Sequence, residues 1–145
     1  MQIRKLTEDD LPSLLELYSQ LDSSNADLQL VPSREVWKKI EENKSITYIG
    51  AVEQGKVVAT CFAVIIPNLT NENRPMCFIE NVVTDQNYRK QGLGKKVIDE
   101  AIRIAKENNC YKVFLESGVK RTEAHKFYEK LGFNSDSKKA FLIKL

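Results

Sequence analysis

The sequence is poor in histidine and cysteine. It contains a single histidine, His125, and three cysteines, Cys61, Cys77 and Cys110, which lie far apart. Neither a Cys-x-x-Cys pair nor a Cys/His cluster occurs, so we expect no zinc site, and one histidine excludes a histidine-rich metal site. An odd number of separated cysteines favours free, buried thiols in a reducing compartment. We therefore expect no bound metal and a cytoplasmic location.

Long apolar runs and an excess of one charge are also missing. The longest apolar run, residues 61–67, is far too short to cross a membrane, and residues 1–5 contain no apolar signal-peptide core. The formal net charge is only +2, and Lys and Arg are interleaved with Asp and Glu. There is thus no electrostatic reason to expect nucleic acid or a membrane as a partner.

The length and composition favour one globular domain. The 145 residues are 42% hydrophobic and 29% charged, which is ordinary for a folded protein. A chain of this length can bury a substantial core without disulfides or metals. Because no repeat or linker divides it, we expect residues 1–145 to form a single domain.

Hydrophobic periodicity predicts alternating strands and helices. The first helix follows an N-cap at Thr7, and Ser33 can cap a second, short helix. The segments 22–32 and 67–75 are rich in turn residues and are expected to be loops. Strands are expected at 2–6, 45–52, 57–66, 77–84 and 111–117, with strand character again at Phe133 and at 140–145, and two further helices at 92–108 and 122–131.

This order predicts an α/β sheet with helices on its faces. The strands at 77–84 and 111–117 flank one helix, which makes them a parallel β-α-β unit.

A glycine turn between a strand and a helix is the most informative segment. Gly92 and Gly94 allow the backbone to turn tightly, and the free N–H groups of the following helix make an anion site suited to phosphate. The segment is not a P-loop, because position 89 is Arg89 and Lys95 is followed by another lysine. It is not the dinucleotide fingerprint either, because Val97 replaces the third glycine. On the glycines alone, a tight turn before a well-capped helix is an equally good interpretation.

Two motifs together are informative. The first is Arg89-x-x-Gly92-x-Gly94, preceded by residues 82–85 and Tyr88, and the second is the Ala-x-x-Phe-Tyr-x-x-Leu-Gly-Phe segment of residues 124–133. The first is similar to the pyrophosphate-binding motif of the GNAT family of N-acetyltransferases, and the second to the closing signature of that family. The resemblance covers roughly residues 76–135. It implies a mixed, mostly antiparallel central sheet with helices on both faces, in which a parallel pair of strands splays apart for the cofactor.

The resemblance also implies acetyl-coenzyme A as the acetyl donor and co-substrate. Backbone groups at 82–84 would pair with its pantetheine arm, and the N–H groups at 90–95 would hold its pyrophosphate. Many members carry an asparagine where this chain has Arg121, so that contact is expected to differ. The cofactor-binding residues implied in this way are Val82, Val83, Thr84, Arg89, Lys90, Gln91, Gly92, Leu93, Gly94, Lys95, Arg121, Ala124, Phe127 and Tyr128.

Two residues are candidates for proton transfer. Tyr128 matches the family's usual donor to the leaving thiolate, although it also lies on an apolar helix face and could be a core residue. Glu80 stands in an apolar strand, where burial of a carboxylate is costly unless it is used, which makes it the candidate base. Its alternatives are exposure to solvent or an ion pair, and Glu116 is a weaker candidate base. His125 is expected at the surface.

The expected function is transfer of the acetyl group of acetyl-CoA to a primary amine of a small molecule, by direct attack of the amine on the thioester. The alternatives are a non-catalytic acyl-CoA-binding module and a protein lysine or N-terminal acetyltransferase. A homodimer is left open. By the same resemblance, Trp37, Tyr48 and the loops 22–33 and 67–75 shape the acceptor pocket, although Trp37 fits better as a core anchor for the second helix.

Overall fold

Five strands form one mixed sheet in the computed structural model, which describes all residues 1–145. The sheet order follows the chain order, and every neighbouring pair is antiparallel except the last, which is parallel. The predicted fold class is therefore confirmed. The strands are β1 (Gln2–Lys5), β2 (Ile46–Glu53), β3 (Lys56–Ile66), β4 (Met76–Thr84) and β5 (Lys112–Leu115).

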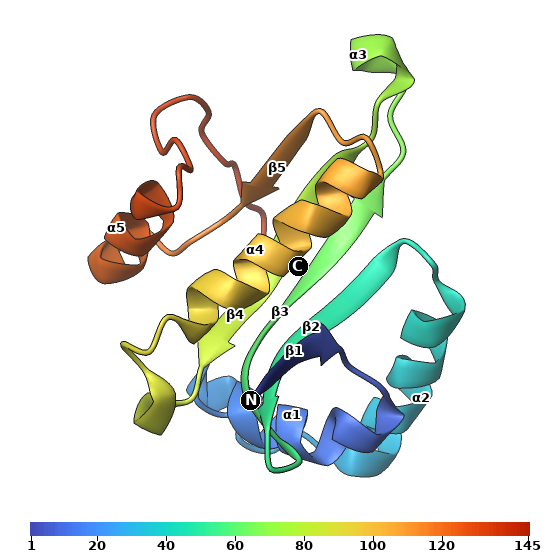
Figure 1. Cartoon of the computed structure of the whole chain (residues 1–145), viewed down its shortest axis with the longest axis vertical. Helices are drawn as coiled ribbons and strands as arrows, with labels where there is room; N and C mark the ends of the chain where they lie inside the picture. The colour runs from blue at the N-terminus through green and yellow to red at the C-terminus, as the bar shows by residue number, and fades with distance from the viewer.

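Helices cover both faces of this sheet (Figure 1). Helix α4 (Leu93–Glu107) crosses one face, and α1 (Leu11–Tyr18) with α2 (Leu30–Glu42) covers the other. Helix α5 (Thr122–Lys130) stands beyond β5, and the single turn α3 (Thr70–Asn73) projects at the far end of β3 and β4. No helix combines the length and the hydrophobicity that a membrane crossing requires. Three short 3-10 turns complete the chain, η1 (Glu8–Asp10), η2 (Ser23–Asn25) and η3 (Gln86–Tyr88).

Each face of the sheet carries its own apolar core, because side chains alternate between the faces along a strand. The α4-side core includes Ile49, Cys61, Ile79 and Ile98, all fully buried. The α1-side core includes Leu14, Leu17, Trp37 and Val57. Trp37 therefore does anchor the second helix, as preferred from the sequence.

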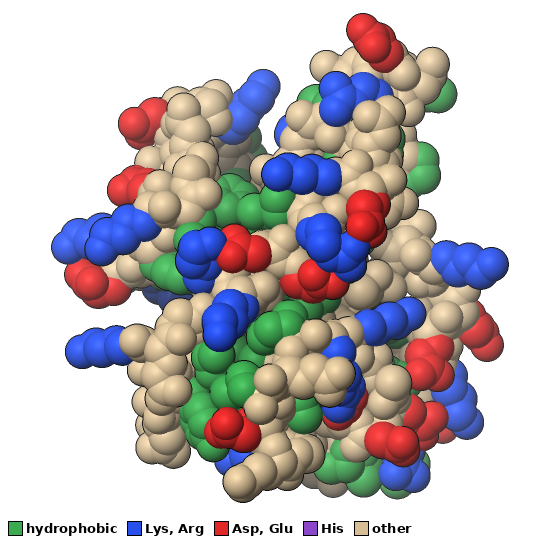
Figure 2. Space-filling model, viewed as in Figure 1, with side chains coloured by type: hydrophobic (Ala, Val, Ile, Leu, Met, Phe, Trp, Pro, Cys, Tyr) green, Lys and Arg blue, Asp and Glu red, His purple; other side chains and the backbone are tan.

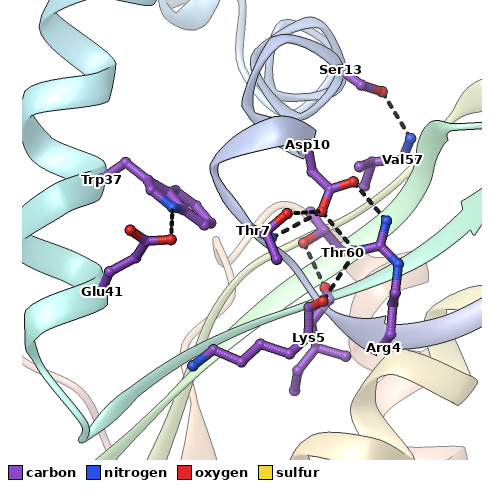
Figure 3. A network of polar contacts seen from close by, with 10 residues as sticks. Arg4, Lys5, Thr7, Asp10, Ser13, Trp37, Glu41, Val57 and Thr60 are labelled. Carbon is purple, nitrogen blue, oxygen red and sulfur yellow. Dashed lines mark hydrogen bonds and ion pairs between the residues drawn. The ribbon is translucent and has the colours of Figure 1, made fainter.

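The start of α1 is fixed to the sheet by polar contacts, as Figure 3 shows. Arg4 on β1 donates two hydrogen bonds of 2.7 Å to the carboxylate of Asp10, which also accepts from the backbone N–H of Thr7 at 2.9 Å. The Ser13 hydroxyl accepts from the backbone N–H of Val57 on β3 at 2.8 Å. These bonds fix the orientation of α1, and with it the position of Tyr18 at its end.

Two predicted elements are wrong in whole or in part. Helix α2 begins at Leu30 with Gln29 as its N-cap, and Ser33 is instead inside the helix, where its hydroxyl donates to the Gln29 carbonyl at 2.7 Å.

The strand character predicted at Phe133 and at 140–145 is also wrong. The backbone N–H of Phe133 bonds to the Tyr128 carbonyl at the end of α5, and residues 140–145 form no strand and are exposed. A strand needs a neighbouring strand to pair with, and an alternating or apolar pattern does not supply one.

Candidate active site

The parallel strands β4 and β5 pair over only four residues each. The ladder runs from Met76 opposite Lys112 to Ile79 opposite Leu115. Beyond Ile79, β4 continues to Thr84, whereas the chain after Leu115 leaves the sheet and enters α5. The edge of residues 80–84 that faces away from β3 therefore has no strand partner. Such an edge can pair with an extended ligand, and it contains the predicted pantetheine-binding residues Val82, Val83 and Thr84.

A β-bulge interrupts β4 at the same place. Thr60 of β3 pairs with Val83 and Phe62 pairs with Glu80, so two β4 residues, Asn81 and Val82, lie opposite Cys61. Asn81 has a left-handed backbone with φ of 53°. The bulge changes the alternation of side chains. As a result Val82 packs against the α4-side core, whereas Asn81 faces the other side of the sheet.

The predicted glycine turn forms a cradle of free amides. Lys90 and Gly92 both have positive φ, 62° and 76°, and the first backbone bond of α4 runs from Lys96 N–H to the Gly92 carbonyl. No side chain caps the helix, so the N–H groups of residues 92–95 have no acceptor. Free amides at a helix N-terminus after such a turn bind anions, phosphate above all.

Gly94 lies where three elements meet. A Cβ atom added there would be 3.3 Å from Phe127 Cζ on α5 and 3.3 Å from Thr84 Oγ1 on β4. Arg89 Nε also donates to the Thr84 carbonyl at 3.3 Å. The three segments that the sequence motifs singled out are thus brought together, and the missing side chain of Gly94 keeps room at their junction.

The remaining predicted cofactor residues lie on α4 and α5 or in the segments that lead into them. Lys90 and Gln91 are exposed, Leu93 is buried, and Lys95 is paired with Asp99 at 2.6 Å. Arg121 is exposed at the N-cap of α5, and Ala124 is half-buried on its first turn.

Tyr128 is 8% exposed and lies between the rings of Phe127 and Phe133. Burial raises the pKa of its hydroxyl, the Arg121 charge opposes this rise, and the Glu80 charge adds to it. No hydrogen bond within the chain holds the hydroxyl, which remains available to another partner. Tyr128 is also a member of the α4-side core, so the ring supports the fold while the hydroxyl stays free.

Glu80 is half-buried and lies opposite Phe62 on β3. Its carboxylate accepts a hydrogen bond of 3.2 Å from the Asn81 backbone N–H. It makes no ion pair, so the structure does not support that alternative. Its negative charge contributes to the raised pKa of Tyr128, after burial and Cys61. Glu116, the weaker candidate, is exposed just after β5.

His125 lies at the surface, where the residue is half-buried. Its Nε2 lies 2.8 Å from the Gly118 carbonyl. It therefore joins α5 to the loop that follows β5. In the same loop, the Ser117 hydroxyl is buried and has no hydrogen-bond partner. No sequence pattern singled out Ser117, because an isolated serine after a strand has no specific signature.

A cavity of about 550 Å³ lies on the other side of the β4 bulge, between α1, α2 and the loop that joins them. Ten of its sixteen lining residues are hydrophobic, and Trp37 and Tyr48 are among them, as is Asn81 of the bulge. No residue of loop 67–75, which was also expected to shape the acceptor pocket, lines this cavity, and the loop lies at the opposite end of β4 (Figure 1).

Charges are mixed on the face of the molecule that carries α4. Figure 2 shows Lys and Arg side chains interspersed with Asp and Glu side chains over this face, while hydrophobic side chains gather at the surface between α4 and α5. At the cradle itself the adjoining charged residues are basic: Arg89, Lys90, Lys95 and Lys96, of which Lys95 is paired with Asp99. Its amides and these individual side chains are therefore the groups that can recognise an anionic ligand there.

Comparison with known proteins agrees with this geometry. Residues 7–133 match the model of the acetyltransferase (GNAT) family. A glucosamine 6-phosphate N-acetyltransferase of Trypanosoma brucei brucei is 34% identical, over 93% of this chain and 90% of that protein. One of Arabidopsis thaliana is 32% identical over 94% and 91%. A solved structure from Agrobacterium tumefaciens is 40% identical, covers all of both chains and gives a TM-score of 0.95. The chain belongs to the acetyltransferase (GNAT) family.

Proposed function

We propose that this protein transfers the acetyl group of acetyl-CoA to the primary amine of a small molecule. The observation that carries the proposal is the amide cradle at residues 92–95, which opens beside the unpaired edge of β4 and against Phe127, the neighbour of Tyr128 on α5. Anion binding, strand-like pairing and proton transfer are thereby available at one junction.

The residues at this junction fit coenzyme A. The free amides suit a pyrophosphate, the unpaired backbone of 82–84 suits an extended amide-containing arm, and the buried Ser117 hydroxyl lacks a partner that a polar ligand would supply. Phe127 and Ala124 would border the arm from α5. Arg121, in place of the family's asparagine, would add a positive charge.

Acetyl-CoA supplies an activated acyl group as a thioester. The protein has to remove a proton from the amine, which is protonated at neutral pH because alkyl ammonium groups have pKa values of about 10. The Glu80 carboxylate is the acceptor of that proton, directly or through water. The Tyr128 hydroxyl is the donor to the sulfur that leaves, and its raised pKa keeps it protonated at neutral pH.

Direct attack by the amine is favoured over an acetylated cysteine. Cys61, on β3 near Tyr128, is fully buried, and burial raises the pKa of its thiol to about 12. The same effect raises the pKa of Cys77 to about 11. Since the thiolate is the nucleophilic form, neither residue can accept the acetyl group efficiently at neutral pH.

The small-molecule acceptor is supported by the names of the curated relatives, which state glucosamine 6-phosphate, and by the open cavity beside the bulge. A cavity of about 550 Å³ is the size of a small-molecule site. The competing hypotheses are a non-catalytic acyl-CoA-binding module and an enzyme that acetylates protein lysines or N-termini.

Two measurements test the proposal. Calorimetry with the purified protein should detect binding of acetyl-CoA and of CoA, and free-thiol detection should show CoA release that depends on an added small amine. Binding without release with any amine would support the non-catalytic module, and no binding at millimolar acetyl-CoA would refute the proposal. Release with peptide substrates alone would support protein acetylation.

We also propose a homodimer and a cytoplasmic location. The C-terminal segment 140–145 supports the first, because Phe141 and Ile143 are 92% and 85% exposed and one edge of β5 is free. Three cysteines without a disulfide support the second.

A further inference from the structure

The cavity between α1 and α2 has an almost uncharged lining. Of the sixteen lining residues only Asp27 carries a charge, and no Lys, Arg or His is present. Burying a phosphate among such residues would leave two negative charges without a compensating cation, which is very costly. The cavity is therefore unsuited to a sugar phosphate such as glucosamine 6-phosphate, which two curated relatives have in their names.

Its walls are suited to an apolar body. Leu11, Leu14 and Ile40 line it from the two helices. Trp37 and Tyr48 form an aromatic wall, with ring centroids 5.1 Å apart, and Trp37 Nε1 is already bonded to Glu41 at 2.9 Å, as Figure 3 also shows. The indole thus presents only its apolar surface, and aromatic faces also attract an ammonium group.

One polar group inside the cavity lacks a partner. The Tyr18 hydroxyl is sealed from bulk solvent and forms no hydrogen bond of normal geometry, and the whole residue is 8% exposed. Burial raises the pKa of this hydroxyl, and the polar Asn81 side chain, toward which the hydroxyl can donate, partly opposes the rise. Burial of a hydroxyl without a well-formed hydrogen bond is unfavourable. A ligand that bonds to it would recover that cost, so the hydroxyl marks where a polar end of the ligand lies.

The place of this hydroxyl fits the reacting end of an acceptor. Tyr18 and Asn81 both line the cavity, and Asn81 is the bulge residue that follows Glu80 on β4. The amine would therefore lie at the bulge, within reach of the proposed base, while the apolar body extends between α1 and α2.

We infer that the acceptor is an amine with an apolar or aromatic body and no phosphate, held in this cavity with its nitrogen at Tyr18 and Asn81. The inference rests on the proposed function, which it makes more specific.

An acceptor panel tests the inference. With saturating acetyl-CoA, CoA release should be compared for 2-phenylethylamine, hexylamine, glucosamine and glucosamine 6-phosphate. We expect kcat/KM for the two apolar amines to exceed that for glucosamine 6-phosphate by about tenfold or more, because the phosphate would meet no cation in the cavity. A kcat/KM that is highest for glucosamine 6-phosphate would overturn the inference and leave the proposed acetyl transfer intact.

A binding measurement distinguishes failure of the proposed acetyl transfer from failure of the inferred acceptor class. Calorimetry with 2-phenylethylamine should be run in the presence of CoA, with glucosamine 6-phosphate as the competing probe. If no amine is turned over but 2-phenylethylamine binds and glucosamine 6-phosphate does not, the catalytic proposal fails, whereas the ligand preference inferred for the cavity stands. If 2-phenylethylamine does not bind, the inference is wrong.

Tyr18→Phe tests the role of the hydroxyl. The variant should raise KM for 2-phenylethylamine about five- to twentyfold and leave acetyl-CoA binding unchanged. It should keep or increase thermal stability, because it removes a buried group without a partner. Tyr111→Phe is the matched control, because Tyr111 is half-buried just before β5. It should change neither KM for 2-phenylethylamine nor acetyl-CoA binding. A lower melting temperature with an unchanged KM would assign Tyr18 to the core alone and contradict its part in the inference.

Discussion

At the scale of single residues, Tyr128 combines a packed ring with a hydroxyl that is free to bind a ligand. Its ring is part of the α4-side core, yet its hydroxyl has no partner within the chain. The substitution Tyr128→Phe keeps the ring and removes only the hydroxyl. The comparison of activity with stability in this variant can therefore separate the catalytic hypothesis from the core hypothesis.

We expect Tyr128→Phe to lower kcat by about 10² or more with acetyl-CoA affinity changed less than about twofold. In the unchanged protein, the raised pKa of Tyr128 means that loss of its proton causes no decline in kcat below about pH 10. Stopped-flow or thiol-release kinetics from pH 7 to 10 check both points. An unchanged kcat would leave Tyr128 with its structural role only.

Glu80→Gln should lower kcat/KM for the amine by about 10², because the amide cannot accept the proton, while calorimetry should show unchanged binding of CoA. Glu116→Gln is the matched control, since Glu116 is the exposed alternative after β5. If the control loses the activity and Glu80→Gln retains it, the assignment of the base is reversed.

At the scale of elements, the junction of β4, α4 and α5 depends on the missing side chain of Gly94. Alanine there would place a Cβ 3.3 Å from both Phe127 and Thr84, so the two must move and the cradle changes shape. We expect Gly94→Ala to weaken CoA binding about tenfold. The melting temperature should change little, because alanine is favoured over glycine in a helix by up to about 1 kcal/mol. Calorimetry and a melting curve are the measurements. Undiminished CoA binding would contradict the claim that close packing at Gly94 shapes the cradle.

The link between β1 and α1 makes a separate prediction on stability. Hydrogen bonds from Arg4, aided by the Thr7 backbone, hold the pKa of Asp10 below its usual value against the opposing effect of burial. A lowered folded-state pKa means that the stabilisation is complete above about pH 4 and is lost as the pH falls through the folded value.

Asp10→Asn should therefore reduce the free energy of unfolding by about 2 kcal/mol at pH 7, because one partner of a partly buried charged pair is removed. The difference between variant and unchanged protein should shrink toward pH 3. Urea unfolding at pH 7 and at pH 3 measures it, and an equal difference at both would contradict the role of the carboxylate charge.

At the scale of the whole molecule, the exposed C-terminal segment predicts association. Light scattering should give twice the mass of 16.6 kDa at micromolar concentration, and Phe141→Ser together with Ile143→Ser should shift the protein to a monomer. Leu69→Ser is the control, because Leu69 is 90% exposed at the other end of the sheet. A monomeric unchanged protein at all concentrations would refute the dimer.

Much of the fold follows from local patterns. The apolar faces of α1 and α4, the hairpin of β2 and β3, and the glycine turn at Gly92 could all be predicted, because each depends on neighbouring residues. The start of α2 and the C-terminal segment could not. Ser33 is an acceptable cap in isolation, but the packing of residues from Leu30 onward extends the helix by a turn.

Local sequence was thus enough to predict the strand–glycine turn–helix unit, because glycine conformations and free helix-end amides act over a few positions. Glu80 became a candidate from its place in an apolar strand, and Tyr128 from the resemblance to the family. The bulge that turns Asn81 toward the cavity, the parting of β4 from β5 and the buried hydroxyl of Tyr18 required the folded chain. Each of these depends on contacts between residues far apart in the sequence. Helical periodicity can assign Tyr18 to the apolar core, but only the tertiary structure shows whether its hydroxyl has a hydrogen-bond partner.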